Sequence, residues 1–451
     1  MNKSTLAIAV AVGLLAQQAS AAGFIEDSKA TLKLRNFYIN NDNRDSGTPK
    51  NSNYTAEWGQ GFQLDFASGF TQGTVGFGID AIGLLGVKLD SSTAKHGNPT
   101  GANYGGSVFP SDGNHAVDDF SSLGLTAKAK VSQTELRIGT LQPKLPVIVS
   151  NDGRMLPQTF QGGQITSSEF KDLTFTGGQI EHAKGRNSSN NEGLSIAGAN
   201  NSITGKFVNK FYYGGVDYKV NKDLLLQYYY GNLEDFYKQN FLGLVHNWSI
   251  GPGVLKSDLR YFNSTDDGKN GYNSAYYTTG DYANSSAGSG KGKVDNNLIS
   301  GLFLYTVEGH TFGGGYQVSN GSSDFPFLNQ GDGASAYIPT DMQISKFARA
   351  GERTWQARYS YDFAKVGVPG LTAGAVYLRG DNIDTYSNKN VQTSNGASEW
   401  ERDITVAYVI QEGALKNLGF MWKNAMWRND IASTRDQDEN RLIVSYSIPL
   451  L

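Results

Sequence analysis

The chain has 451 residues, no cysteine and a formal net charge of −3. The absence of cysteine excludes a disulfide-stapled secreted module and thiol chemistry, and the lack of a basic surplus argues against a nucleic-acid-binding protein. Glycine (55), tyrosine (24) and phenylalanine (23) are abundant, whereas 18% of residues are charged, below the roughly 25% of soluble domains.

The first 21 residues have the features of a secretory signal peptide. Lys3 gives a basic start, Leu6–Leu15 is an apolar stretch too short to span a bilayer, and Ala19-Ser20-Ala21 matches an A-x-A cleavage site. We therefore expect cleavage at or beside Ala21 and a mature chain of residues 22–451. Beyond the signal, no apolar run approaches the roughly 18 residues of a transmembrane helix.

Alternation of apolar and polar residues predicts β-strands along most of the mature chain. In residues 74–81, Val75, Phe77 and Ile79 fall on one face and small or polar residues fall on the other. The same period of two recurs in residues 124–131, 224–231, 254–262, 354–363, 403–410, 418–427 and 441–448. No amphipathic helix of ordinary length interrupts these segments.

Loop lengths are asymmetric along the chain. Tight turns such as 221–223, 251–253 and 308–310 alternate with long polar insertions, which we expect at 263–293, 319–350 and 380–400. Strands of about ten residues with one short-looped end and one long-looped end are typical of an outer-membrane β-barrel. Closure follows because an open sheet edge in lipid would leave backbone groups without partners. A secreted β-rich carbohydrate-binding or hydrolytic protein predicts similar alternation and is the alternative.

Enzymatic motifs give little support to a catalytic function. None of the five histidines has H-E-x-x-H spacing, and there is no G-x-S-x-G nucleophile elbow. Residues 76–81 match G-x-G-x-x-A only formally, since they lie inside an alternating strand rather than at the start of a helix. The acidic run Asp436–Glu439 is interpreted as a solvated loop. We therefore expect no enzyme activity, no metal site and no cofactor.

The strand faces opposite the apolar ones carry many basic residues. If the apolar faces contact lipid, the lumen holds Lys33, Arg35, Lys128, Lys130, Arg137, Lys256, Arg260, Arg358, Lys423 and Arg441, together with the acids Asp80, Glu135, Asp258 and Asp362. Charges avoid the lipid face because a lysine or arginine at mid-bilayer costs about 2–4 kcal/mol. That cost does not explain the basic surplus, and a lumen that collects charges of both signs is the alternative.

Three long segments, residues 139–165, 230–268 and 310–384, resemble the OprD family of outer-membrane carboxylate channels. The likeness extends from about Gly23 to the C-terminus and is closest to the branch associated with benzoate-like aromatic carboxylates. It implies an all-β, eighteen-stranded barrel in outer-membrane lipid, a monomer or weak trimer, that takes up small carboxylates passively. It also implies that the third extracellular loop (about 141–163) folds inward and narrows the pore with the seventh (about 319–350). A general diffusion porin is a further alternative.

Residues 151–154 match the N-D-x-R motif of the family, which implies that Arg154 lies at the constriction. A guanidinium suits a carboxylate because it donates two parallel hydrogen bonds and stays charged at physiological pH. The resemblance also carries over Asp332, Ser335 and Tyr337 from the seventh loop as substrate contacts, and it implies that the basic lumen residues form a track for carboxylates. A solvated loop arginine is the alternative, and it would be the better interpretation of Arg154 in an isolated loop without the surrounding motif.

The chain departs from the family pattern at three positions. Met421 and Val376 stand where relatives often carry arginine, so we expect a thinner basic track. The chain ends in Leu451 rather than in the aromatic residue common at the end of outer-membrane barrels.

Overall fold

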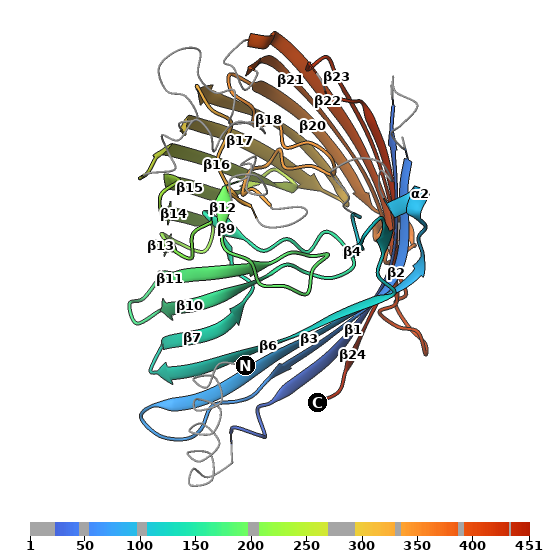
Figure 1. Ribbon diagram of the computed structural model, residues 1–451. Coiled ribbons are helices and arrows are strands. Elements are labelled where there is room, and N and C mark those ends of the chain that lie inside the picture. Colours follow the sequence, from blue (N-terminus) through green and yellow to red (C-terminus); the bar gives the residue numbers. More distant parts are fainter. Residues whose placement is uncertain are drawn as a thin grey trace.

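The computed structural model describes residues 23–44, 54–96, 106–196, 207–268, 294–329, 335–386, 392–432 and 434–451. The predicted signal peptide and Asp332 lie outside the described residues. The chain forms an 18-stranded antiparallel sheet in which strand β24 pairs with strand β1, so that the sheet closes into a barrel (Figure 1). The predicted all-β barrel with eighteen strands is confirmed.

The barrel strands follow one another in chain order around the wall. They are β1 (Lys29–Asn43), β2 (Tyr54–Ala67), β3 (Gly76–Asp90), β6 (Asp119–Val131), β7 (Thr134–Leu141), β10 (Thr159–Ser167), β11 (Leu173–Lys184), β13 (Phe211–Lys219), β14 (Leu224–Leu233), β15 (Tyr237–Ile250), β16 (Gly253–Asp266), β17 (Asp295–Val307), β18 (His310–Gly321), β20 (Arg353–Asp362), β21 (Leu371–Tyr386), β22 (Gln392–Val409), β23 (Gly419–Asn429) and β24 (Gln437–Pro449). Each strand is bonded to its chain neighbours, so the barrel is a simple meander.

Short elements lie in the connections between barrel strands. They are helix α2 (Thr93–His96), the 3₁₀ turn η2 (Phe363–Val366) and the two-residue strands β4 (Ser111–Asp112), β5 (His115–Ala116), β8 (Lys144–Leu145), β9 (Ile148–Val149), β12 (Ser195–Ile196) and β19 (Leu328–Asn329). None of the helices in the described part of the chain is long and apolar enough to cross a membrane.

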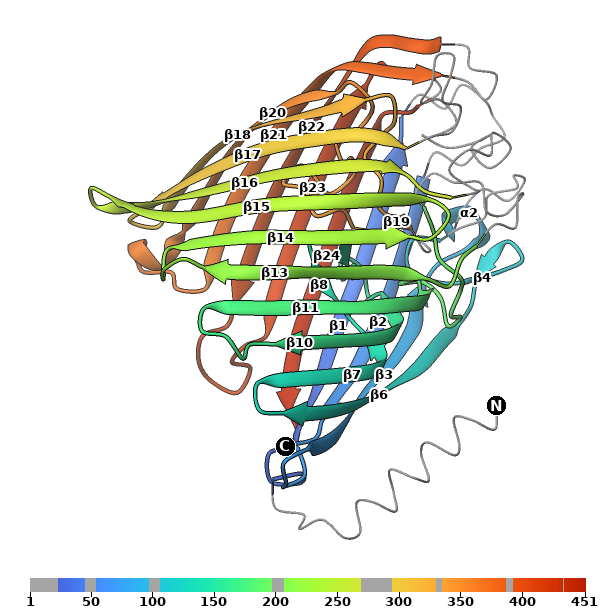
Figure 2. The ribbon, with the colours of Figure 1, turned by 90° about the vertical axis from the view of Figure 1, so that its left-hand side faces the viewer.

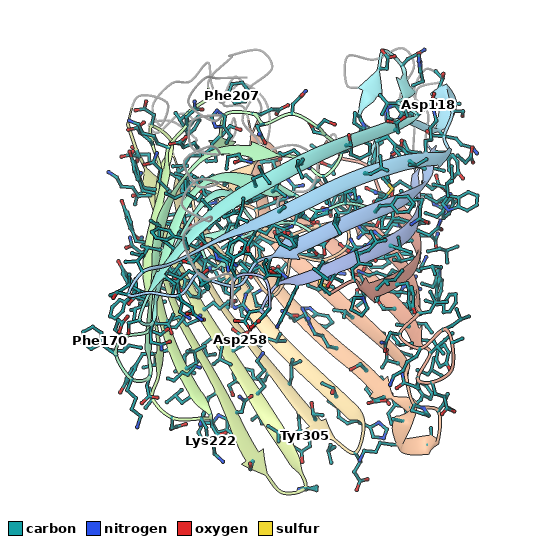
Figure 3. All side chains as sticks on the ribbon, turned by 90° about the horizontal axis from the view of Figure 1, so that it is seen from below. Asp118, Phe170, Phe207, Lys222, Asp258 and Tyr305 are labelled. Atoms are coloured by element: carbon teal, nitrogen blue, oxygen red, sulfur yellow. The ribbon has the colours of Figure 1, made fainter. Side chains whose placement is uncertain are left out.

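The two ends of the barrel differ as the sequence predicts. At one end, hairpins close through as few as two residues, for example Glu308 and Gly309, whose φ values of 48° and 86° fit the tight turn that matches strand twist. The other end carries the long connections (Figure 2). Seen from below, Lys222 of a short turn and Asp118 of a long connection lie at opposite ends (Figure 3). The long insertion predicted at 380–400 is wrong, because β21 extends to Tyr386 and β22 begins at Gln392.

Strand parity separates a lipid face from a lumen face. Phe77 is 49% exposed and Tyr228 is 43% exposed on the outer wall, whereas Tyr229 is fully buried on the inner side. The period of two sets this division because successive side chains of a strand point to opposite faces. The outward assignment of Val75, Phe77 and their neighbours agrees with the sequence prediction.

Two apolar clusters inside the barrel hold the long connections against the wall. The larger joins Phe211, Phe241 and Phe262 of the wall to residues of three inward-folded connections, including Ile148, Ile196 and Ile338. The smaller joins Phe37 and Leu84 of the wall to Phe109 and Met155. Burying each such side chain stabilises the fold by about 1.5–3 kcal/mol, so these connections are part of the packed structure.

Hydrogen bonds also fix the second long connection to strand β2. The buried His96 Nδ1 lies 2.6 Å from Glu57 Oε1, and its Nε2 lies 2.8 Å from Ser111 Oγ. The Val108 N–H donates to the other oxygen of Glu57 at 2.8 Å. Glu57 therefore acts as an anchor for residues 106–111 and the short helix α2.

Candidate functional site

Loop 3, residues 142–158 between β7 and β10, crosses the interior of the barrel. Val147 and Ile148 pack in the larger apolar cluster, and Met155 and Leu156 pack in the smaller one on the opposite wall. The predicted boundaries of 141–163 are too long at the C-terminal side, since residues 159–163 belong to β10. Anchored on both walls, loop 3 holds residues 151–154 between two packed ends.

Three wall glycines form the socket for Met155. A Cβ at Gly59 would lie 2.6 Å from Met155 Sδ, one at Gly86 would lie 2.6 Å from its Cε, and one at Gly61 would lie 2.9 Å from its carbonyl oxygen. These separations are shorter than real contacts, so a side chain at any of the three positions would displace the loop.

Three arginines converge on the tip of loop 3. The Asn151 side chain accepts from the Gly153 N–H at 2.8 Å and from Arg186 at 2.9 Å. Arg35 on β1 donates to both carboxylate oxygens of Asp152, at 2.7 and 3.2 Å, and to the carbonyl of Arg154 at 2.7 Å. The arrangement fixes the tip and surrounds it with guanidinium groups.

Arg441 on β24 completes this group. It donates to the Gly153 carbonyl at 3.3 Å and to Glu439, whose side chain is 2% exposed. Arg154 lies on the other side of the same carboxylate, with Nη2 at 3.9 Å from Glu439 Oε2, and its side chain is 11% exposed. Lys423 is the cross-strand neighbour of Arg441. Four basic residues thus lie in one region of the lumen: Arg35, Arg154, Lys423 and Arg441. Arg154 is held among the other three and Glu439.

The described residues of loop 7, 322–329 and 335–352 between β18 and β20, pack in the larger apolar cluster together with loop 3. Arg260 donates to the Tyr337 carbonyl at 3.1 Å and lies 4.1 Å above the Tyr337 ring, which meets Phe241 edge-on. Burial raises the pKa of the Tyr337 hydroxyl, so this group stays protonated. Ser335 is half-buried nearby in the chain, and the predicted contact Asp332 lies outside the described residues.

Two other lumen arginines also bind the backbone of loop 7. Arg358 donates to the carbonyl of Pro339 and lies 3.8 Å from Met342 Sδ. Arg441 donates to the carbonyl of Gln343 at 2.9 Å, so this one side chain connects loop 7 to loop 3. These basic lumen residues therefore position the loops as well as adding charge to the lumen.

Acidic residues of β22 hold loop 7 from the other side. Glu399, Glu401 and Asp403 share the inner face of the strand and are all buried. Glu401 accepts from the N–H groups of Ile344 and Ser345 at 2.9 and 2.7 Å, and Glu399 accepts from the Ser345 hydroxyl at 2.7 Å. In the described part of the chain, no group of three or more acidic or histidine side chains is arranged to hold a metal ion.

The remaining basic lumen residues lie nearer the short turns. Lys33 pairs with Asp65 at 2.7 Å, and Arg137 pairs with Asp80 at 3.3 Å. Lys128 also pairs with Asp80, but it is 6% exposed and lies under the 68–70 turn, 4.8 Å from the Phe70 ring centroid. Lys130 faces the same ring at 5.7 Å. Lys256 is exposed and has no ion-pair partner among the described residues.

A cavity of about 450 Å³ lies at the base of loop 3. Its lining includes Asp65, Asp80 and Arg137 of the wall and Gln142 and Pro143 of the loop. The space between the loops and the short turns is thus lined by charges of both signs.

Sequence reasoning missed several residues of this region. The acidic run Asp436–Glu439 is not a solvated loop, since Glu439 is a buried residue of β24 beside Arg441. Glu399 lies in the predicted 380–400 insertion and Glu401 lies just beyond it, although their alternate spacing is that of one strand face. Arg186 lies in a connection without periodicity, so no local pattern points to it.

A closed barrel with an apolar outer face and inward-folded loops defines a membrane channel. The chain matches the model described as "outer membrane porin, OprD family" over residues 22–450. It therefore belongs to the OprD family, and it is a substrate-specific, non-enzymatic channel of the bacterial outer membrane. The alternative of a secreted carbohydrate-binding or hydrolytic protein is excluded.

Individual relatives agree with this assignment. The porin-like protein GalP of Pseudomonas putida is 36% identical over 449 residues, which is 99% of this chain and 97% of GalP. The crystal structure of Pseudomonas aeruginosa OccK8 (OprE) has a TM-score of 0.84 at 61% identity and covers 95% of this chain and 100% of its own. That of Pseudomonas aeruginosa OpdK with vanillate has a TM-score of 0.80 at 35% identity, with the same coverage of 95% and 100%.

Proposed function

We propose that this channel takes up small monoanionic carboxylates, aromatic acids of the benzoate type among them, and that Arg154 contacts the carboxylate as it passes. The observation that carries the proposal is the convergence of Arg35, Arg154, Arg186 and Arg441 on the tip of loop 3, where two carboxylates, Asp152 and Glu439, face four guanidinium groups. A surplus of positive charge in a narrow, low-dielectric-walled passage attracts anions.

A relative and the chemistry of the walls support the aromatic preference. OpdK is solved with vanillate, itself an aromatic carboxylate. In this chain, Tyr337 and the edge-on Phe241 lie beside Arg260, so a flat ring and an anionic group would meet complementary partners. The basic track then extends through Arg260, Arg358 and Lys423. The apolar side chains of Met421 and Val376 interrupt it.

A general diffusion porin is the second candidate. The packing of loops 3 and 7 in a shared apolar cluster disfavours it, because a general porin needs an open aqueous lumen. A non-selective lumen would also be expected to present about as many carboxylates as basic groups. At the tip of loop 3, by contrast, four guanidinium groups face two carboxylates.

The test is a flux comparison of benzoate and benzamide in liposomes, supported by current block in planar bilayers. Wild-type channel is expected to favour benzoate. Arg154→Ala is expected to lower benzoate flux mainly at low concentration, since a weak site matters most when it is not saturated. Arg154→Lys should recover only part of the loss, because an ammonium keeps the charge but lacks the bidentate geometry.

Lys222→Ala is the control, since it removes one cation from a short turn where the side chain is 91% exposed. It is expected to leave the benzoate preference unchanged. Equal flux of benzoate and benzamide through the wild type would refute selection by charge. An unchanged preference for benzoate in Arg154→Ala would indicate that the wall arginines, and not Arg154, make the selective contact.

A further inference from the structure

Four consecutive strands each carry an arginine on the outer wall of the barrel. They are Arg353 on β20, Arg379 on β21, Arg402 on β22 and Arg428 on β23, here called the arginine surface. Their outward direction follows from strand alternation, because adjacent Thr354, Leu378 and Glu401 are fully buried on the inside and Trp427 is 7% exposed.

The arginines lie close together across the strands. Arg379 is the cross-strand neighbour of Trp400, which is in turn the neighbour of Arg428. Arg402 lies two residue pairs nearer the short turns, and Arg353 lies two pairs nearer the long loops, so each is the next residue on the same face. Three large rings interleave with them: Trp355, Tyr377 and Trp400 follow each other at centroid distances of 5.4 and 5.8 Å.

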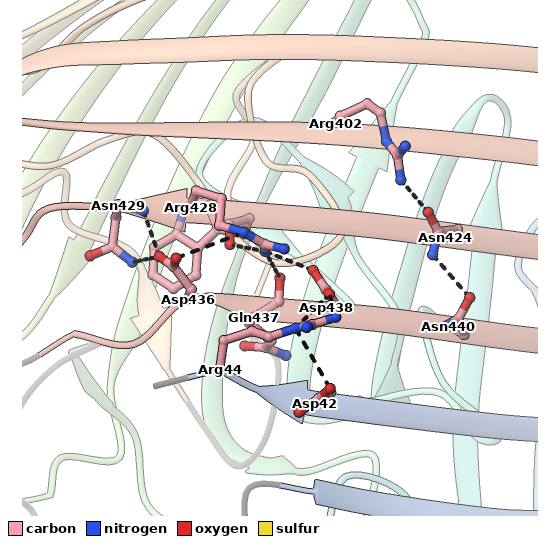
Figure 4. A network of polar contacts seen from close by, with 11 residues as sticks. Asp42, Arg44, Arg402, Asn424, Arg428, Asn429, Asp436, Gln437, Asp438 and Asn440 are labelled. Atoms are coloured by element: carbon pink, nitrogen blue, oxygen red, sulfur yellow. Dashed lines mark hydrogen bonds and ion pairs between the residues drawn. The ribbon is translucent and has the colours of Figure 1, made fainter. Parts of the chain in front are cut away.

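Most of this positive charge is not neutralised within the protein. Among the described residues, the side chains of Arg353 and Arg379 form no ion pair or hydrogen bond, and Asp381 is the cross-strand neighbour of Arg353. Arg402 meets only the Asn424 amide, which donates to Asn440 at 3.0 Å (Figure 4).

Arg428 has a different environment at the rim. It pairs with Asp438 at 2.7 Å and with Asp436 at 3.7 Å in the network of Figure 4. Its charge is therefore balanced, and the surplus of the surface comes from Arg353, Arg379 and Arg402.

The depth of these residues places them in the outer leaflet. On β22, the outward side chains above Tyr408 are Val406, Ile404 and then Arg402, six residues away. Six residues span about 20 Å along a strand, and a tilt of about 40° reduces this to about 15 Å, so Arg402, measured from Tyr408 at the inner edge, lies in the outer half of a bilayer band of about 25 Å. Arg379 and Arg353 lie at pairs two and four residues nearer the long loops and are therefore closer to the outer edge of the band. Interleaved tryptophan and tyrosine are typical of this boundary between acyl chains and headgroups.

We infer that the arginine surface binds the phosphate groups of an anionic glycolipid of the outer leaflet, of the lipid A type. Guanidinium groups donate paired hydrogen bonds to phosphate, and the flanking rings offer apolar contact to the acyl chains. Clusters of basic residues at a membrane interface recognise anionic lipid headgroups in this way. A second copy of the chain docked by the same face would oppose arginine with arginine, so lipid is the occupant that the charge favours.

The experiment is native mass spectrometry of the detergent-purified channel titrated with bis-phosphorylated lipid A, its dephosphorylated form and phosphatidylcholine. The wild type is expected to bind bis-phosphorylated lipid A about tenfold more tightly than the other two lipids. The triple variant Arg353→Gln, Arg379→Gln, Arg402→Gln should lose this preference, while Lys222→Gln keeps it. Heat-modifiable gel migration shows whether each variant is folded. If the triple variant fails to fold, Arg379→Gln alone replaces it, with an expected threefold loss of affinity for bis-phosphorylated lipid A.

Two results overturn the inference. One is equal binding of the phosphorylated and dephosphorylated lipids by the wild type, and the other is unchanged binding in the arginine variants. A channel dimer that dominates the mass spectrum of the wild type and is lost in the arginine variants likewise counts against a lipid site. Carboxylate flux is independent of all these outcomes, because the surface lies outside the lumen.

Discussion

Replacement of Arg441 by alanine is expected to loosen the constriction while leaving the barrel folded. Arg441 joins Gly153 of loop 3, Gln343 of loop 7 and the buried Glu439. The Arg441–Glu439 pair lies within β24 and persists when the loops move, so the loops depend on the two charged hydrogen bonds to the carbonyls of Gly153 and Gln343. A hydrogen bond to a charged group contributes about 1.5–3 kcal/mol. At the lower limit, losing both costs about 3 kcal/mol, which raises the population of displaced loops roughly 150-fold.

The assay is single-channel recording in planar bilayers. Arg441→Ala is expected to show higher conductance and greater open-channel noise than the wild type, since both loops lose a shared tether. Lys256→Ala is the matched control, because it removes one lumen cation that has no ion-pair partner among the described residues. Conductance and noise in Arg441→Ala that equal those of Lys256→Ala would refute the tethering role and leave only a charge effect.

Three further predictions concern other anchors of the loops. Gly61→Ala places a Cβ 2.9 Å from the Met155 carbonyl, so we expect a loss of about 1–3 kcal/mol in unfolding free energy and an altered conductance, whereas Gly314→Ala, with no atom within 4 Å, should change neither. Burial and the neighbouring Glu399 raise the pKa of Glu352 well above its usual range. Folding therefore favours the protonated form, and thermal stability in detergent should fall as pH rises through that raised pKa. Glu352→Gln should make this fall smaller, and an equal fall in wild type and variant would contradict the contribution of Glu352. His96→Leu removes a donor from the buried Glu57 at a cost of about 1–3 kcal/mol, and it should expose residues 106–118 to limited proteolysis; equal cleavage of wild type and variant would count against the anchor.

The barrel could be predicted because lipid imposes one rule on every strand. Phe77, Leu226 and Tyr228 alternate with lumen residues, and the period of two assigns each to its face without knowledge of the neighbouring strand. The short turns are equally local, as the φ values of Glu308 and Gly309 show. The same parity rule placed the basic residues on the lumen face.

The environment of those lumen residues could not be predicted, because it depends on where the loops fold. The parity of Lys128 and Lys256 is the same, but a turn covers the first and leaves the second exposed. Glu439 is part of an acidic run that would be solvated on an isolated hairpin. It is buried because loop 3, nearly three hundred residues earlier in the chain, brings Arg154 against it.

The tip of loop 3 is held by Arg35 on the first strand and Arg441 on the last, the two strands that meet at the seam of the barrel. Until the chain is complete and its ends have joined, these two contacts cannot exist together on one side of the lumen. The narrow passage therefore cannot be complete before the barrel closes. A barrel that has inserted but not yet joined its ends has no selective filter, so the timing of closure also determines when the channel begins to discriminate between solutes.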